Sequence, residues 1–70
     1  MEEVIIITRD INGNRNGHYL RWDNVCDYID KDENIREDEI LLVLADGVCI
    51  YSGLQYDGTL SWDDLVGFFA

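Results

Sequence analysis

The chain begins with an unbroken apolar run and then turns polar. Residues 4–7 are Val-Ile-Ile-Ile, and such a run of β-branched side chains predicts a central strand near residues 3–11. Residues 12–17 are Asn and Gly with one Arg, and Asn and Gly tolerate the positive φ that tight turns need. We therefore expect a hairpin tip there, followed by a short return strand at residues 17–21.

A helical spacing replaces the strand pattern after this hairpin. Trp22, Val25, Cys26 and Ile29 stand at i, i+3, i+4 and i+7, which is the apolar stripe of an amphipathic helix. The spacing predicts a helix over residues 22–31 with one face in the core.

Two further apolar runs flank an Asp-Gly pair. Residues 40–45 and 48–52 have the composition of strands, and Asp46-Gly47 between them is typical of a type I′ hairpin turn, which needs positive φ at both central residues. A helix over residues 38–45 is the alternative. We favour the hairpin because β-forming residues follow the turn.

The end of the chain repeats the pattern of the first helix. Residues 60–69 match residues 20–29 in a Leu-x-Trp-Asp opening and in the apolar positions that follow. Ser61 with Asp64 three residues later resembles a capping box, so we expect a helix over residues 61–69.

Together these elements predict one α+β domain over residues 1–70. Its sheet is mainly antiparallel, with four strands, or five if residues 54–56 add an edge strand before a turn at Asp57-Gly58. Both helices cover one face, and the domain reads as a β-hairpin-helix unit that occurs twice. The predicted core consists of Ile5, Ile7, Trp22, Val25, Ile29, Leu42, Leu44, Ile50, Trp62, Leu65 and Phe69.

Composition excludes several classes of protein. A hydrophobic content of 47% over 70 residues is too high for a disordered acidic tail. The N-terminus lacks the basic region of a signal peptide, and no apolar run approaches the roughly 18 residues of a membrane span. We expect a cytoplasmic protein that does not associate with membranes, in which Cys26 and Cys49 are reduced and buried. Two Cys and one His are too few for a structural zinc site, so we expect no metal or other cofactor.

The negative charge is concentrated in residues 23–39. The whole chain carries −10, and this stretch holds eight acidic and two basic residues, a local charge of −6. The total exceeds the roughly 2 to 8 charges that solubility asks of a small domain, which favours a role in binding a basic partner. The candidate partner-binding residues are Asp23, Asp27, Asp30, Asp32, Glu33, Glu37, Asp38 and Glu39, with Trp22 and Tyr28 as anchors.

The sequence offers little for catalysis or for calcium binding. His18 has no identifiable nucleophile partner, so we do not expect an enzyme. Residues 30–34 begin like an EF-hand loop, but Ile35 replaces the required Gly and Leu41 replaces the bidentate Glu. A solvated charged loop is the better interpretation of these residues.

Direct binding to nucleic acid is also disfavoured. Arg9, Arg15 and Arg21 gather near the first hairpin together with His18, but the fifteen acidic residues of the chain would repel a phosphate backbone. The arginines are better explained as solubilising groups or as partners of nearby acids.

In its size, acidity, lack of catalytic residues and α+β character, the chain resembles the small phage-encoded inhibitors of bacterial defence, the anti-CRISPR and anti-restriction proteins, several of which are DNA mimics. The resemblance is one of general character and involves no motif, so it assigns no role to any residue. It implies a basic, nucleic-acid-binding target, such as a CRISPR surveillance complex or effector nuclease, whose groove the acidic surface would occupy.

An alternative function is that of a structural or interaction module, such as an assembly subunit or a nuclease immunity protein. Such a module would bind its partner through exposed aromatic side chains, for which Tyr19, Tyr51 and Tyr56 are the candidates. We expect a monomer or a weak homodimer, and a stable homo-oligomer formed through the sheet edge would favour this alternative over a free inhibitor.

Overall fold

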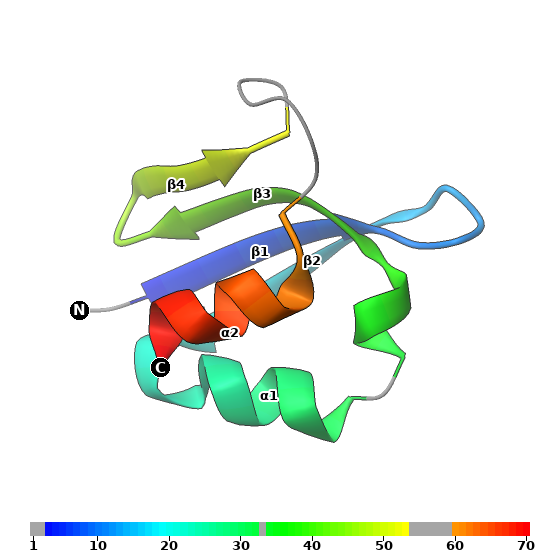
Figure 1. The fold of residues 1–70 in the computed structure, drawn as a ribbon. Helices are drawn as coiled ribbons and strands as arrows, with labels where there is room; N and C mark the ends of the chain where they lie inside the picture. The colour runs from blue at the N-terminus through cyan, green and yellow to red at the C-terminus, as the bar shows by residue number, and fades with distance from the viewer. Residues whose placement is uncertain (1–2, 33, 54–59) are drawn as a thin grey trace.

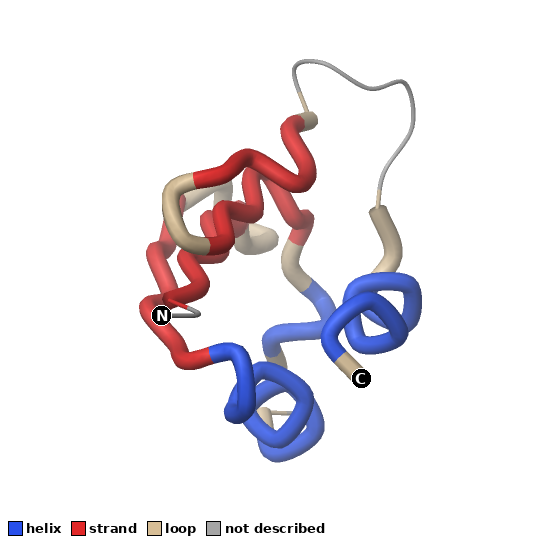
Figure 2. Tube along the Cα trace, turned by 90° about the vertical axis from the view of Figure 1, so that its left-hand side faces the viewer, coloured by secondary structure: helices blue, strands red, loops and turns tan. Residues whose placement is uncertain are grey.

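Four strands and two helices make up the fold in the computed structural model (Figure 1), which describes residues 3–32, 34–53 and 60–70. The strands form one antiparallel sheet in the order β2-β1-β3-β4, and both helices lie on one side of it (Figures 1 and 2). The predicted α+β class is confirmed. The elements are β1 (Glu3–Arg9), β2 (Arg15–Arg21), the 3-10 turn η1 (Trp22–Asn24), α1 (Val25–Lys31), the 3-10 turn η2 (Ile35–Glu37), β3 (Glu39–Ala45), β4 (Val48–Ser52) and α2 (Trp62–Phe69).

The order of elements is a hairpin followed by a helix, twice. Strands β1 and β3, the first of each hairpin, are antiparallel neighbours in the centre of the sheet, and β2 and β4 lie outside them. The two helix starts differ. Ser61 caps α2 by accepting a hydrogen bond from the Asp64 N–H at 3.1 Å, whereas Arg21 offers no cap, and the first helix begins with the 3-10 turn η1. The predicted single helix over residues 22–31 is therefore divided at Val25.

The turn between β3 and β4 has the predicted geometry. Asp46 has φ of 51° and Gly47 has φ of 81°, so both central residues adopt the positive φ of a type I′ turn. Strand β3 pairs with both β1 and β4, so the alternative of a helix over residues 38–45 is wrong.

The first hairpin turns earlier than predicted. Its tip lies between Asp10 and Asn14, with Gly13 at φ of 86°, and residues 15–17 already belong to β2. The Asp10 carboxylate closes the loop, because its Oδ1 accepts hydrogen bonds from the N–H groups of Asn12 and Asn14 at 3.0 and 2.9 Å. The bond from the Asn14 N–H is the main cause that lowers the pKa of Asp10.

The side chains of β1 alternate between the two faces of the sheet. Val4, Ile6 and Thr8 are fully buried beneath the helices, and Ile5 and Ile7 lie half-buried on the opposite face. The prediction that Ile5 and Ile7 form the core is therefore wrong, because the buried side of β1 is formed by the residues next to them.

Two irregularities shift the phase of the second hairpin. Ile7 pairs with Leu42 and Thr8 pairs with Ile40, so Leu41 is an extra residue in β3 and forms a β-bulge. As a result Ile40 and Val43 both face the helices. The predicted core residues Leu42 and Leu44 lie half-buried on the opposite face of the sheet. In β4 Cys49 pairs with Leu44 and Tyr51 pairs with Val43, so Ile50 is an extra residue between them. The predicted core residue Ile50 is half-buried, and Tyr51 is buried instead.

The helical part of the predicted core is confirmed except for Trp22. Val25 and Ile29 of α1 pack with Trp62, Leu65 and Phe69 of α2, and each is less than 10% exposed. The predicted core residue Trp22 is half-buried at the edge of this cluster. Ile35 of η2, which was not among the predicted core residues, is also buried, at 2% exposure.

A chain of polar side chains connects the sheet to α1. Thr8 is a polar residue in the core, and its hydroxyl lies 3.1 Å from Nε2 of His18. The other ring nitrogen of His18, Nδ1, lies 2.8 Å from the hydroxyl of Tyr28. These contacts give the buried Thr8 hydroxyl the partner that its burial requires, and they hold His18 away from the arginines with which the sequence grouped it.

The two cysteines differ in exposure. Neither is in a disulfide bond, as predicted, and Cys26 is half-buried in α1. Cys49 is exposed, contrary to prediction, because its pairing with Leu44 puts it on the face of the sheet away from the helices. The predicted edge strand at residues 54–56 and the turn at Asp57-Gly58 lie outside the described residues.

The type I′ turn generates a stability prediction with a matched control. Gly47→Ala puts a side chain at φ of 81° and should destabilise the fold by about 1 kcal/mol. Gly67→Ala, in α2, meets no atom within 4 Å and should stabilise it by about 0.5 to 1 kcal/mol through helix propensity. Urea denaturation measures both. Equal effects of the two substitutions would contradict the turn geometry.

Candidate protein-binding surface

Exposed carboxylates occupy the outer side of both helices. Asp23 of η1 and Asp27 and Asp30 of α1 stand four and three residues apart, which aligns them along the helix about one turn from each other. Asp63 and Asp64 are exposed in the first turn of α2. We call these five residues the helical acidic surface. Because α1 and α2 pack side by side (Figure 1), carboxylates from distant parts of the sequence form one surface.

Arg36 connects the two helices through this surface. Its Nη1 donates to Oδ1 of Asp63 at 2.9 Å, and its Nη2 donates to Oδ1 of Asp30 at 3.3 Å. The hydrogen bond to Asp63, followed by that to Asp30, raises the pKa of Arg36. The guanidinium therefore partly neutralises these two carboxylates, while Asp23 and Asp27 make no ion pair within the described residues.

Two acids of the connection between α1 and β3 have structural roles. Oδ1 of Asp32 accepts hydrogen bonds from the N–H groups of Asn34 and Ile35 at 3.0 and 3.3 Å, which starts the turn η2. The backbone carbonyl of Asp38 accepts a hydrogen bond from Nε1 of Trp62 at 2.9 Å, which fixes η2 against α2. The side chains of both acids are half-buried.

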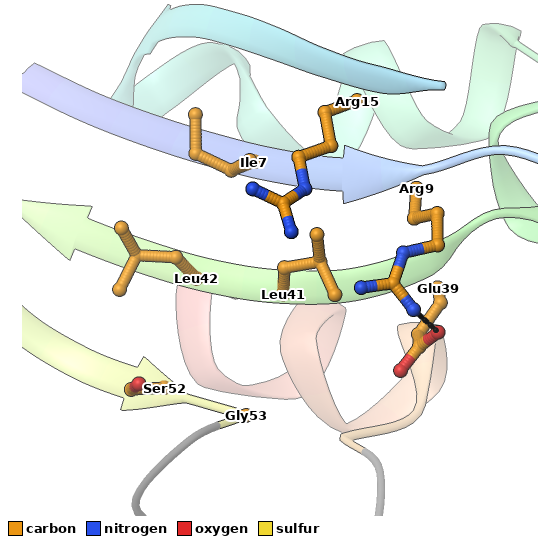
Figure 3. A pocket seen from close by; sticks show the side chains of 8 residues that line it. All are labelled: Ile7, Arg9, Arg15, Glu39, Leu41, Leu42, Ser52 and Gly53. Atoms are coloured by element: carbon orange, nitrogen blue, oxygen red, sulfur yellow. Dashed lines mark ion pairs between the residues drawn. The ribbon is translucent and has the colours of Figure 1, made fainter. Parts of the chain in front are cut away.

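The remaining predicted acids lie in different places. Glu37 is exposed on η2. Glu39 begins β3 on the face of the sheet away from the helices, where its carboxylate lies 3.6 Å from the guanidinium of Arg9 (Figure 3). It is therefore not part of the helical acidic surface. Glu33 lies outside the described residues.

The two predicted anchors make intramolecular contacts. Trp22 packs edge-on against Phe69, with ring centroids 4.6 Å apart, and against Phe68 at 5.8 Å. Tyr28 contacts the ring of His18 as well as Nδ1. Both anchors remain half-exposed, and Phe68 beside Trp22 is 47% exposed.

Three surface residues were absent from the predicted site although the sequence contained a signal for each. The match between residues 20–29 and 60–69 places Asp63 at the position equivalent to Asp23, and Asp64 follows it. Phe68 lies off the stripe of buried residues in α2, so a helical projection turns it towards solvent. The aromatic residues of the alternative hypothesis differ in exposure. Tyr19 is 65% exposed, Tyr51 is buried at 8%, and Tyr56 lies outside the described residues.

The opposite side of the sheet has a different chemical character. Aliphatic side chains of β1 and β3 form its centre, Tyr19 lies beside them on β2, and arginines lie at the strand ends. We call this side the open sheet face, because neither described helix covers it (Figure 2). A hollow of about 330 Å³ lies at one end of it (Figure 3). The hollow is lined by Ile7, Arg9, Arg15, Glu39, Leu41, Leu42, Ser52 and Gly53.

The polar side-chain contacts that the structure describes on this face involve Arg9 and Tyr19. Arg9 pairs with Glu39, and Tyr19 donates to the carboxylate of Glu3, which is the main cause that raises the pKa of Tyr19. Arg15 and Arg21 form no ion pair with the part of the chain that the structure describes. Three of the five basic residues of the chain thus lie on the open sheet face.

Among residues 3–32, 34–53 and 60–70, no group of three or more His, Cys, Asp or Glu side chains is placed to hold a metal ion. The same residues contain no helix long and apolar enough to span a membrane. Comparison with protein-family models, with curated proteins and with solved structures found no match.

The ion pairs of Arg36 with Asp30 and Asp63 predict that the stability of the protein depends on salt. Arg36→Gln removes a cation between two acids of neighbouring helices and should lower the melting temperature by a few degrees at low salt. The loss should fade at high salt, since screening weakens exposed ion pairs and the repulsion between carboxylates. Arg15→Gln is the control and should change the melting temperature less. Thermal denaturation at two salt concentrations checks this, and a loss independent of salt would contradict it.

Proposed function

We propose that this protein is a stoichiometric inhibitor that binds a basic, nucleic-acid-binding protein of bacterial defence through its helical acidic surface. The observation that carries the proposal is the separation of charge between the two sides of the sheet. Five exposed carboxylates lie on the helices, whereas Arg9, Arg15 and Arg21 lie on the open sheet face. A body with this distribution presents one strongly negative side to a partner.

Electrostatics explains how such a surface would find its target. A summed field from several carboxylates steers a basic partner and speeds association, even though each exposed pair contributes only about 0 to 1 kcal/mol. Nucleic-acid grooves in proteins are lined with Lys and Arg that bind phosphates. The helical acidic surface would offer negative charge to the same side chains and so exclude the nucleic acid.

Affinity also requires apolar contact, because wet ion pairs alone bind weakly. Trp22 of η1 and Phe68 of α2 supply it, because their rings pack in a T-shaped arrangement and both retain exposed surface. Tyr28 is the second anchor, on α1. We assign these aromatic residues to the centre of the contact and the carboxylates to its rim.

The target class comes from the resemblance to anti-CRISPR and anti-restriction proteins. The resemblance implies a CRISPR effector or surveillance complex as the target, and the protein would act as a DNA mimic that occupies its nucleic-acid groove. This proposal places the protein in the bacterial cytoplasm as a phage product.

Charge reversal tests which side of the protein binds. Asp23→Lys with Asp27→Lys, and Glu3→Lys with Glu39→Lys, each change the net charge from −10 to −6, on opposite sides of the sheet. The first pair should slow association with the target at least about tenfold at low salt, whereas the second should have a much smaller effect. Target captured from a bacterial lysate, with association measured by surface plasmon resonance, supplies the measurement.

Competition tests the mechanism of the inhibitor. The captured partner should release this protein when an oligonucleotide is added, and should release it more easily as salt rises. A partner that holds the oligonucleotide and this protein together would contradict groove occupation. In the charge-reversal experiment, equal loss of binding by both double variants would show that the total charge matters and that the helical acidic surface does not.

A further inference from the structure

The side chains of the open sheet face are arranged in rows across the strands. The β1–β3 register places Ile5 beside Leu44 and Ile7 beside Leu42, so two adjacent rows are aliphatic at their centre. All four side chains are half-buried, and neither described helix covers them. Such a surface loses unfavourable contact with water when another apolar surface packs on it.

Charged side chains lie at both ends of this aliphatic centre. At one end Arg9 pairs with Glu39 across β1 and β3, and at the other Glu3 of β1 pairs in register with Arg21 of β2. The described side chains of this face include three arginines and two glutamates, which sum to +1, while the chain as a whole carries −10. The open sheet face is therefore the side on which two copies of this acidic chain repel each other least.

The register also makes the face complementary to itself. When two copies pack face to face about a two-fold axis parallel to the strands, between β1 and β3, β1 of each copy lies over β3 of the other. Ile5 then meets Leu44, Ile7 meets Leu42, and Arg9 of each copy meets Glu39 of the other. Each contact occurs twice, as a two-fold interface requires.

The size of the face fits a stable interface. The chain has an accessible surface of 4752 Å², and a standard interface takes about 800 Å² from each partner, roughly a sixth of this total. At the usual strand spacing and rise, a four-stranded sheet with strands of five to seven residues measures roughly 19 by 23 Å. The arginine side chains, which reach across the sheet in Figure 3, can follow the crossing angle of about 30° that packed sheets adopt.

From these observations we infer that the protein forms a two-fold symmetric homodimer through the open sheet face, with reciprocal Arg9–Glu39 ion pairs between the copies. The dimer is a β-sandwich that carries its two helical acidic surfaces on opposite outer sides. This inference does not rest on the proposed function. If both hold, the dimer is bivalent and gains effective affinity for a target with repeated basic grooves.

Sedimentation equilibrium from roughly 1 µM to 1 mM, the range of weak to moderate affinities, tests the dimer. The mass should rise from 8.1 kDa towards twice that value, and added salt should favour the dimer because it screens the repulsion between two chains of charge −10. Ile7→Lys should keep the protein monomeric. A wild-type mass of 8.1 kDa throughout would overturn the inference and leave the open sheet face to a different partner.

Complementary charge variants test the arrangement itself. Arg9→Glu and Glu39→Arg should each weaken self-association by roughly tenfold or more, because each places like charges opposite one another twice. An equimolar mixture should form a heterodimer, because both carboxylates of the first variant then meet guanidinium groups of the second, and both pairs between copies become attractive. Within each variant chain, positions 9 and 39 carry charges of the same sign, also in the mixture. An ion pair within one chain therefore cannot explain a recovery of dimer formation on mixing.

Controls separate the interface from folding and from net charge. Lys31→Glu on α1 changes the net charge as much as Arg9→Glu does and should leave the dimer affinity within about threefold. Circular dichroism should show that both charge variants remain folded. A mixture that contains no more dimer than either variant alone would overturn the proposed two-fold arrangement.

Discussion

The alternation of side chains along β1 is the constraint on which the two surfaces of this protein depend. β1 is hydrogen-bonded to β2 on one edge and to β3 on the other, so its phase fixes which residues of its neighbours face the helices. Val4, Ile6 and Thr8 lie beneath α1 and α2, which leaves Ile5 and Ile7 on the other side. A shift of β1 by one residue would exchange these two sides of the strand, and the charged Arg9 would be buried together with Ile5 and Ile7.

The helices were predictable from the sequence, and the phase of the strands was harder to predict. A helix of this size buries one stripe, so the apolar spacing identified Val25 and Trp62 directly. The apolar run of β1 has no alternation, and only the charged residues Glu3 and Arg9, in phase with Ile5, mark the exposed side. In β3 the bulge at Leu41 reverses the phase within the strand, and nothing in the residues themselves indicates a bulge there.

The candidate site could be predicted only in part from the sequence. Acidity is a property of the composition, whereas the distribution of the acidic residues over the surface depends on the fold. The chain leaves α1, passes through η2 and enters the sheet, so Glu39 ends on the face opposite Asp27. Packing of α2 against α1 brings Asp63 within reach of Arg36, which also holds Asp30. Three of the four arginines are placed by the phase of the strands, since the side of β1 and β2 away from the helices carries Arg9, Arg15 and Arg21. The fold thereby gives this acidic chain two chemically distinct sides.

The central claim is that the two sides of the sheet differ in electrostatic potential, and charged paramagnetic co-solutes measure this directly. The ratio of amide proton relaxation caused by a cationic probe to that caused by an anionic probe of the same size cancels differences in accessibility. We expect this ratio to be well above one at Asp27 and Asp63 on the helices, and close to one or below at Arg15 and Arg21 on the strands. The same ratio on both sides of the sheet would contradict the account.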